Sequence, residues 1–368
     1  MNKVLQNKDQ VLSKTITFVR FPLIMAIVLI HTYISDQPNI GGVIMIPSGS
    51  FPAFDTFEYI LRQCLAELAV PTFFLISGFL FFYKTDSFTV EKYKYKLKKR
   101  FHSLLIPYIV WNLIYMVYVL VVQTIVPSIT SPDRKMILDY SIIDFVDSFW
   151  HYDGVTYGGP IYGPLWFIRD LIVIDILSPL FYYVIKKTKF YSLILIGLLY
   201  IAGIGLLTPG LGMQSILFYL IGAYCSINKM NLVCMKDTFI HALLLLGTVL
   251  LLLDIVLRGN DINPYLHRAF IVSMTLILLP MVAKFVVKTD NEFLYPLLAE
   301  SSFFVYVTHR FIISFPNKYW VLLMPVNCFT ASIALIFIPI AVSLICFTIY
   351  LILKRISRKF AAFLIGGR

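Results

Sequence analysis

An arginine and a histidine interrupt the first apolar stretch of the sequence, at Arg20 and His31. On a helix, the eleven residue steps between them make three turns plus about 20° and rise about 16 Å, so the side chains would share one face. A histidine can take a proton from a hydroxyl group, and a buried arginine can hold an anion. We therefore expect proton transfer at His31 and anion binding at Arg20. The alternative is that both residues are interfacial, with Arg20 extending toward the cytoplasm.

The second apolar stretch carries charged and hydroxyl groups where lipid should be. Glu67 lies deep in it, and Ser77 precedes Gly78. Because an ionisable group in a membrane span is costly and usually faces the protein interior, we expect Glu67 and Ser77 to line a cavity. An ion pair between Glu58 and Arg62, four residues apart, and close helix packing at the Ser-Gly pair are the alternatives.

The fourth and ninth apolar stretches carry the remaining polar candidates. Arg169 and Asp170 follow Trp166 near the start of the fourth stretch, and His309 lies toward the end of the ninth. We expect these four side chains to line the outer end of one cavity, near His31. An arginine–carboxylate pair inside the helix bundle is the alternative for Arg169.

Seven cations crowd the segment 84–100. Lysine and tyrosine alternate in its second half, a pattern that could pair phosphates and stack a base. We expect a cytoplasmic loop that binds a phosphorylated donor through four side chains, which are Lys96, Lys98, Lys99 and Arg100. A stop-transfer cluster that touches anionic lipid is the alternative.

The histidines and cysteines do not show the spacing of a metal site. No histidine has an acid or a second histidine at metal-ligand spacing, so we expect no metal. The cysteines are odd in number and lie in or beside apolar runs, so we expect free thiols. They are Cys64, Cys225, Cys234, Cys328 and Cys346.

Composition places these candidates in a membrane. Of the 368 residues, 59% are hydrophobic and only 14% are charged, whereas soluble domains are typically about 25% charged. This excludes a soluble enzyme, a disulfide-stapled secreted module and a disordered scaffold. We expect an all-α integral membrane protein with about ten transmembrane helices. They would run approximately 15–35, 59–83, 103–126, 163–185, 190–207, 213–227, 238–257, 268–288, 296–316 and 327–353.

The distribution of lysine and arginine predicts the orientation. With the N-terminus in the cytoplasm, 22 cations fall in cytoplasmic segments and five in external ones, as the positive-inside rule requires. Both termini would then be cytoplasmic, and the net charge of +11 reflects topology and no nucleic-acid partner. We expect one transmembrane domain over 1–368, with no separate soluble domain. The first stretch, which no cleavage site follows, should remain in the mature protein.

Five motifs occur in order along this frame. They are Arg20 with His31, Val70-Pro71 before the run 73–80, Lys98-Lys99-Arg100 before Leu105-Ile106-Pro107-Tyr108, the run 165–171, and Val305-Tyr306-Val307-Thr308-His309. Together they resemble the acyltransferase 3 family of bacterial polytopic membrane proteins, which acylate extracytoplasmic sugars. The resemblance covers residues 15 to about 315.

The resemblance implies an activity and its substrates. Arg20 and His31 would be the active-site pair. Cytoplasmic acyl-CoA, with acetyl-CoA favoured over succinyl-CoA, would be a donor substrate, and no cofactor would be bound permanently. The acceptor would be a hydroxyl of a glycan or lipid-linked saccharide outside the bacterial cytoplasmic (inner) membrane. Because no hydrolase-like domain follows residue 353, we expect direct transfer or transfer to a separate partner.

A polytopic transporter or exporter of a lipid-linked saccharide is the alternative function, because it would also have many helices and intramembrane charges. The sequence shows no two halves with corresponding broken helices, which disfavours a transporter. A sensory or scaffold protein is a third class, and the many charges within spans disfavour it.

Overall fold

The computed structural model describes residues 2–39, 42–85, 87–125, 135–152, 158–206, 208–287 and 294–367. Within these ranges the chain is helical, and the pairing of strands is limited to one isolated bridge between Pro38 and Ile44. The expected all-α fold is confirmed. Its longer helices are α1 (Asn2–Ile30), α3 (Ala69–Phe82), α4 (Val90–Arg100), α5 (Ile106–Ile125), α7 (Trp166–Ile176), α8 (Ser178–Thr188), α9 (Tyr191–Ile201), α10 (Met213–Ile227), α11 (Asp237–Val256), α12 (Asn263–Val286), α13 (Leu294–Leu323) and α14 (Cys328–Ile356).

Shorter helical segments connect or extend these helices. They are α2 (Pro52–Glu58), the π-helix η1 (Tyr59–Leu65), η2 (Ala66–Leu68), the π-helix η3 (Phe101–Leu105), η5 (Ile137–Asp139), α6 (Ile142–Asp147), η6 (Gly163–Leu165) and α15 (Arg358–Leu364). The expected external loops 36–58 and 127–162 thus contain α2 and α6, and parts of the second loop, 127–134 and 153–157, lie outside the described residues.

Six helical segments of the described chain are long and apolar enough to cross a membrane. They are Lys8–Ile30, Pro52–Phe82, Val90–Ile125, Asp237–Val256, Asn263–Val286 and Cys328–Ile356. Two shorter apolar helices lie in the predicted fifth and sixth stretches: α9 covers 191–201 of the stretch 190–207, and α10 coincides with 213–227. Each of the ten predicted stretches overlaps a helix, and the whole has the character of a multi-pass membrane protein.

The basic segment is a helix, so the expectation of a loop there was wrong. Its N-terminus is capped by Thr89, whose side chain accepts a hydrogen bond from the Lys92 N–H at 3.4 Å. No glycine interrupts the residues that follow, and the helix continues from α4 through η3 and past Pro107 into α5. Six of the seven cations, all except Lys84, stand along this helix.

The predicted span 163–185 is divided into two helices. α7 ends at Ile176, and α8 begins at Ser178 with Pro179 in its first turn. Proline has no N–H to continue the hydrogen bonds of α7, so the chain bends there. Arg169 and Asp170 therefore belong to a short helix of eleven residues.

Glycines bring α3 and α10 into backbone contact. A Cβ added at Gly78 would lie 2.0 Å from the Tyr219 carbonyl oxygen, and one added at Gly222 would lie 2.0 Å from that of Leu75. The close packing expected at Ser77-Gly78 is confirmed. This contact fixes α3, and with it Ser77, within the bundle.

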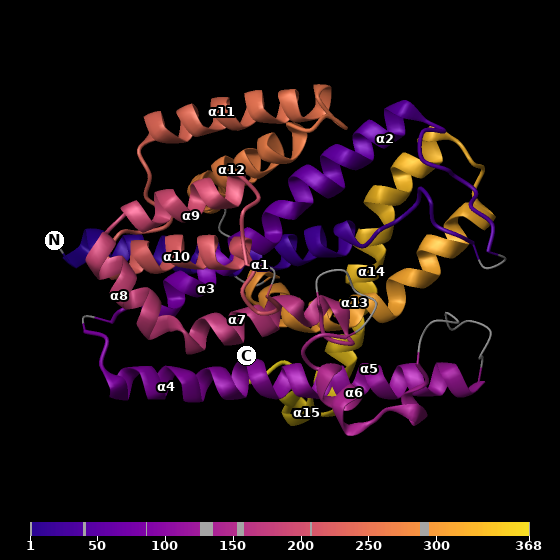
Figure 1. Ribbon diagram of the computed structural model, residues 1–368, viewed down its shortest axis with the longest axis horizontal. Helices are drawn as coiled ribbons and strands as arrows, with labels where there is room; N and C mark the ends of the chain where they lie inside the picture. The colour runs from indigo at the N-terminus through magenta and orange to yellow at the C-terminus, as the bar shows by residue number, and fades with distance from the viewer. Residues whose placement is uncertain are drawn as a thin grey trace.

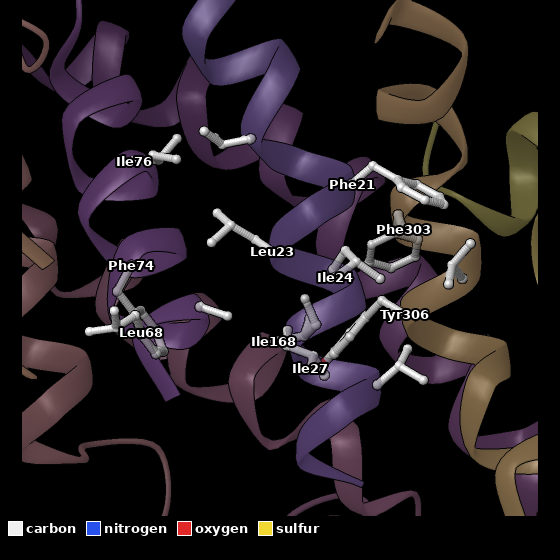
Figure 2. Packing of buried hydrophobic residues seen from close by; sticks show 14 of the residues in the cluster. Phe21, Leu23, Ile24, Ile27, Leu68, Phe74, Ile76, Ile168, Phe303 and Tyr306 are labelled. Carbon is white, nitrogen blue, oxygen red and sulfur yellow. The ribbon is translucent and has the colours of Figure 1, made fainter. Parts of the chain in front are cut away.

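α1 lies inside the bundle, while α4–α5 and α11 lie along opposite edges (Figure 1). Figure 2 shows Ile24 and Ile27 of α1 on the side toward Phe303 and Tyr306 of α13, and Ile76 of α3 beyond α1. These side chains are buried and form an apolar wall beside the middle of α1.

Candidate active site

A cavity of about 570 Å³ lies between α1, α3, α7 and α13. Its size falls within the range of small-molecule sites, about 300–1,000 Å³. Three of the predicted site residues line it, which are Arg20, Ser77 and Arg100. Most of the other lining side chains are apolar, so a ligand there would be largely removed from water.

Two helices give the cavity its length. The lining runs from Thr17 to Ile27 on α1 and from Pro296 to Tyr306 on α13. A rise of about 1.5 Å per residue makes each of these walls about 15 Å long. α1 is unbroken through Pro22, so nothing shortens the distance along it.

Charged side chains face the first half of the cavity. Arg20 is exposed to it and makes no hydrogen bond or ion pair that joins it to another described residue. Arg100 Nε lies 2.9 Å from Asp175 Oδ2, a charge contact without hydrogen-bond geometry. Glu300 is occupied by Lys354 at 2.7 Å and by the hydroxyl of Tyr350 at 2.8 Å. Of the two arginines that line the cavity, Arg20 is therefore the one whose guanidinium can still make all its hydrogen bonds to a ligand.

His31 and His309 lie about one helical turn beyond the end of the cavity that is opposite Arg20. They follow the last lining residues, Ile27 and Tyr306, by four and three positions. Their rings stack with centroids 5.3 Å apart and planes inclined by 27°. The structure therefore brings the two histidines together from segments far apart in the sequence.

His309 is held with one nitrogen free. Its Nδ1 lies 2.7 Å from the Tyr306 carbonyl oxygen and 3.3 Å from that of Val305. A carbonyl oxygen can only accept, so Nδ1 carries the hydrogen and the neutral ring has its lone pair on Nε2. That Nε2 is buried and has no hydrogen-bond partner among the described residues. It can accept a hydrogen bond from a bound hydroxyl group.

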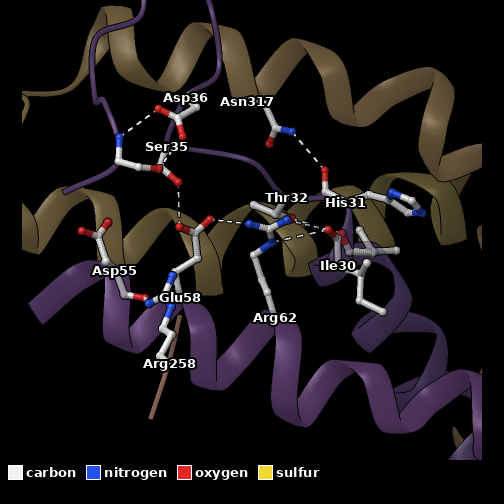
Figure 3. Close-up of polar contacts among 12 residues, drawn as sticks. Ile30, His31, Thr32, Ser35, Asp36, Asp55, Glu58, Arg62, Arg258 and Asn317 are labelled. Carbon is white, nitrogen blue, oxygen red and sulfur yellow. Dashed lines mark hydrogen bonds and ion pairs between the residues drawn. The ribbon is translucent and has the colours of Figure 1, made fainter. Parts of the chain in front are cut away.

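His31 is not helical, and its position is set by the surrounding chain. α1 ends at Ile30, whose carbonyl oxygen accepts a hydrogen bond from Arg62 at 3.1 Å (Figure 3). Glu58 pairs with Arg62 and accepts from the Ser35 hydroxyl at 2.7 Å. Asn317 donates to the His31 carbonyl oxygen at 3.2 Å.

The Glu58–Arg62 pair expected from their spacing is therefore present, and it closes the C-terminal end of α1. The loop that follows is ordered by Asp36, which accepts hydrogen bonds from the Ser48 hydroxyl and backbone N–H. These bonds hold the pKa of the Asp36 carboxyl below its ordinary value. The surroundings of His31 are thus built from several segments that spacing along one helix could not connect.

The remaining predicted residues do not line the cavity. Trp166 is half-buried against Phe74, with ring centroids 6.3 Å apart. Glu67 is partly exposed and lies 3.1 Å from His267 Nε2. Both side chains are directed to other parts of the protein.

Arg169 and Asp170 form an ion pair at 2.9 Å, the alternative stated for them above. Arg169 also donates to the carbonyl oxygens of Trp150, at 2.7 Å, and Gly158. Asp170 accepts from the Ser215 hydroxyl at 2.9 Å. The pair joins α7 to α10 and to the segment before η6.

Comparison with known proteins decides the class. The family model of the acyltransferase domain Acyl_transf_3 matches residues 14–363. The chain belongs to the acyltransferase 3 family. No curated protein and no solved structure matches it. The protein is a membrane enzyme that transfers acyl groups other than aminoacyl groups, and the transporter interpretation is set aside.

In this acyltransferase the four predicted donor-binding cations, all on α4, have different surroundings. Arg100 alone of them lines the cavity. Lys96 donates to the Phe81 carbonyl oxygen, and Lys99 lies over the ring of Tyr95 at 4.5 Å. Lys98 is exposed. Only the C-terminal end of α4 is therefore positioned to act inside the bundle.

Several cavity and support residues of the acyltransferase were missed from the sequence. Tyr306 and Glu300 line the cavity, and Asn317 supports His31. Tyr306 lies within a motif that carried the family resemblance, which was the one signal available for it. Glu300 and Asn317 follow no spacing rule, because their partners come from other helices.

Proposed function

We propose that this acyltransferase moves an acyl group, acetyl in the first instance and succinyl as the alternative, from acyl-CoA to a hydroxyl group of an extracytoplasmic saccharide. The observation that carries the proposal is the cavity between Arg20 and the His31–His309 pair. It supplies an apolar path of about 15 Å through the bundle. The thioester arm of the donor would lie in this path.

The donor would enter from the end where Arg20 and Arg100 line the cavity. Guanidinium groups bind phosphate oxygens through charge-assisted hydrogen bonds. Arg20 has this capacity to spare, and the exposed Lys98 stands on the helix that leads to Arg100. We assign the nucleotide end of acyl-CoA to this side, outside the apolar part of the cavity.

The chemical step would take place beside His31. The acceptor oxygen attacks the thioester carbonyl carbon, a C–O bond forms, the C–S bond breaks, and CoA leaves as the thiol. His31 takes the proton from the acceptor hydroxyl and returns it to the departing sulfur. His309, stacked on His31 with Nε2 free, would accept a hydrogen bond from the acceptor and orient it.

This function requires a defined orientation. We propose ten spans with both termini in the cytoplasm of a bacterial cell, in its inner membrane, which places Arg20 toward the donor and His31 toward the acceptor. A cysteine at Ser50 should react with an impermeant thiol reagent in intact cells, and one at Ser87 should not. The parent chain sets the background from its five native cysteines. Reversed labelling would overturn the orientation.

The activity is tested with sealed membrane vesicles of known orientation that contain the native glycans. Acetyl-CoA labelled in the acetyl group is supplied on the cytoplasmic face, and ester-linked label on saccharide is measured by mass spectrometry. We expect transfer by the wild-type chain and none by His31→Ala. If the wild-type chain consumes neither acetyl-CoA nor succinyl-CoA, the donor assignment is wrong.

A further inference from the structure

A second cluster of reactive side chains lies where η1, α11 and α12 meet, apart from the cavity. Asp254 Oδ2 lies 3.0 Å from His267 Nδ1 and 3.7 Å from Cys64 Sγ. All three donor atoms lie within 4.8 Å of one another. Cys64 and Asp254 are fully buried, and the His267 side chain is 18% exposed.

The spacing of these atoms suits a metal ion. Zinc takes thiolate, imidazole and carboxylate ligands at about 2.0–2.3 Å in a tetrahedron, which places ligand atoms about 3.3–3.6 Å apart. The observed separations of 3.0 and 3.7 Å bracket these values. A thiolate and a carboxylate together would neutralise the charge of one divalent ion.

A second layer of hydrogen bonds orients the three donors. His267 Nε2 lies 3.1 Å from Glu67 Oε2, so its other nitrogen can face an ion. The Tyr59 hydroxyl donates to Asp254 Oδ1 at 3.0 Å, and Asn263 donates to the same oxygen. Both bonds leave Asp254 Oδ2 for the ligand side. Carboxylate-bound histidines and hydrogen-bonded carboxylates are the usual support of protein metal ligands.

The fold assembles this arrangement from distant segments. Cys64 belongs to the π-helix η1, Asp254 to the last turn of α11, and His267 to the second turn of α12. π-Helical turns are rare and frequently occur at functional sites. The partial exposure of His267 and Glu67 gives an ion a path from the surface.

We propose that Cys64, Asp254 and His267 bind one Zn²⁺ ion, with a water molecule completing the tetrahedron. The ion would join the α11–α12 hairpin to η1, the segment that also carries Arg62 and supports the end of α1. No metal was expected from the sequence, because Cys64 lies 190 residues before Asp254 and the spacing of 13 residues from Asp254 to His267 matches no metal-ligand motif.

The test uses the full chain, purified in detergent through a tag that contains no histidine and treated with a chelator. Zn²⁺ alone is then added, its stoichiometry is measured by elemental mass spectrometry, and its affinity by competition with a chromophoric chelator. We expect one ion per chain. Co²⁺ in its place should give a thiolate-to-cobalt absorption band.

Cys64→Ser should abolish that band and weaken Zn²⁺ binding, while the matched variant Cys346→Ser, at a buried cysteine outside the cluster, should retain both. Glu67→Gln changes a partly exposed residue and should fold. It should weaken Zn²⁺ binding about 10- to 100-fold, as loss of a supporting carboxylate does. Failure of the wild-type chain to bind Zn²⁺, or equal affinity in Cys64→Ser or Glu67→Gln, would overturn the proposal.

Discussion

The cavity between α1 and α13 and the contact region between α7 and α10 each contain an arginine, but the two arginines differ in their surroundings. Arg20 faces open space in the cavity with no partner among the described residues. Arg169 is 5% exposed, pairs with Asp170 and donates to two carbonyl oxygens. One guanidinium has bonding capacity to spare, and the other has little.

This difference separates a ligand-binding role from a structural one. A buried polar group without partners costs free energy, so a protein retains it where a ligand supplies the missing bonds. The buried Nε2 of His309 meets this criterion, and Arg20, although exposed, also lacks a partner among the described residues where it lines the cavity. Substitutions in the cavity should therefore affect catalysis, and substitutions at Arg169 should affect folding.

The largest effect is expected at His31. His31→Ala should lower the turnover of acyl transfer by about 10²- to 10⁴-fold, because a general base contributes that much. Acetyl-CoA should still raise the melting temperature of the purified variant. His241→Ala, at an exposed histidine, is the control and should match the wild type. Turnover near the wild-type value in His31→Ala would refute the assignment.

His309→Phe sharpens the same comparison. Phenylalanine keeps a ring stacked on His31 but removes Nε2, the nitrogen with no protein partner. We expect a higher KM for the acceptor, with donor binding unchanged. If turnover falls as far as in His31→Ala and the acceptor KM does not change, His309 is the base and His31 supports it.

Arg169→Met should act on stability. It leaves Asp170 buried without its cation, and breaking a buried ion pair in this way costs about 3–5 kcal/mol. The variant should unfold at a markedly lower denaturant concentration in detergent, whereas the fraction that remains folded should bind acetyl-CoA normally. A stable variant with impaired donor binding would place Arg169 in the ligand site.

Arg20→Met should show the reverse pattern. Loss of a charge-assisted hydrogen bond of about 1.5–3 kcal/mol should raise the donor KM about 10- to 100-fold. The melting temperature without donor should remain near the wild-type value, since Arg20 has no partner among the described residues. Arg20→Lys should recover part of the donor affinity, and an unchanged KM in Arg20→Met would exclude the donor role.

The helices and the first half of the site could be predicted because their signals are local. Apolar runs long enough to span a membrane coincide with helices, and Arg20 lies on α1 as its place in the first apolar stretch indicates. Gly78 was recognised as a packing position from its neighbour, Ser77. In each case a few adjacent residues contain the information.

The rest of the site depends on contacts between distant helices. Asn317 reaches His31 across 286 residues, and His267 reaches Glu67 across 200. Trp166 and Glu67 were expected in the cavity because polar or amphipathic residues in spans usually face the protein interior. The interior of one helix bundle contains several separate sites, and these two side chains lie at sites other than the cavity. Sequence periodicity predicts which face of a helix is buried, but it does not predict which other helix packs against that face.

The smallest effect is expected from the exposed end of the basic helix. Lys98→Gln with Lys99→Gln removes two charges that stand outside the cavity. Exposed charges contribute up to about 1 kcal/mol each and are screened beyond about 8 Å at physiological salt. The donor KM should rise a few-fold at low salt and converge with the wild-type value at high salt, because these lysines would attract the donor from solution without binding it in the cavity.

Arg100→Gln, one residue farther along, should raise the KM at both salt concentrations, since Arg100 lines the cavity. A salt-independent increase in the double lysine variant would instead extend the donor site onto the surface of α4.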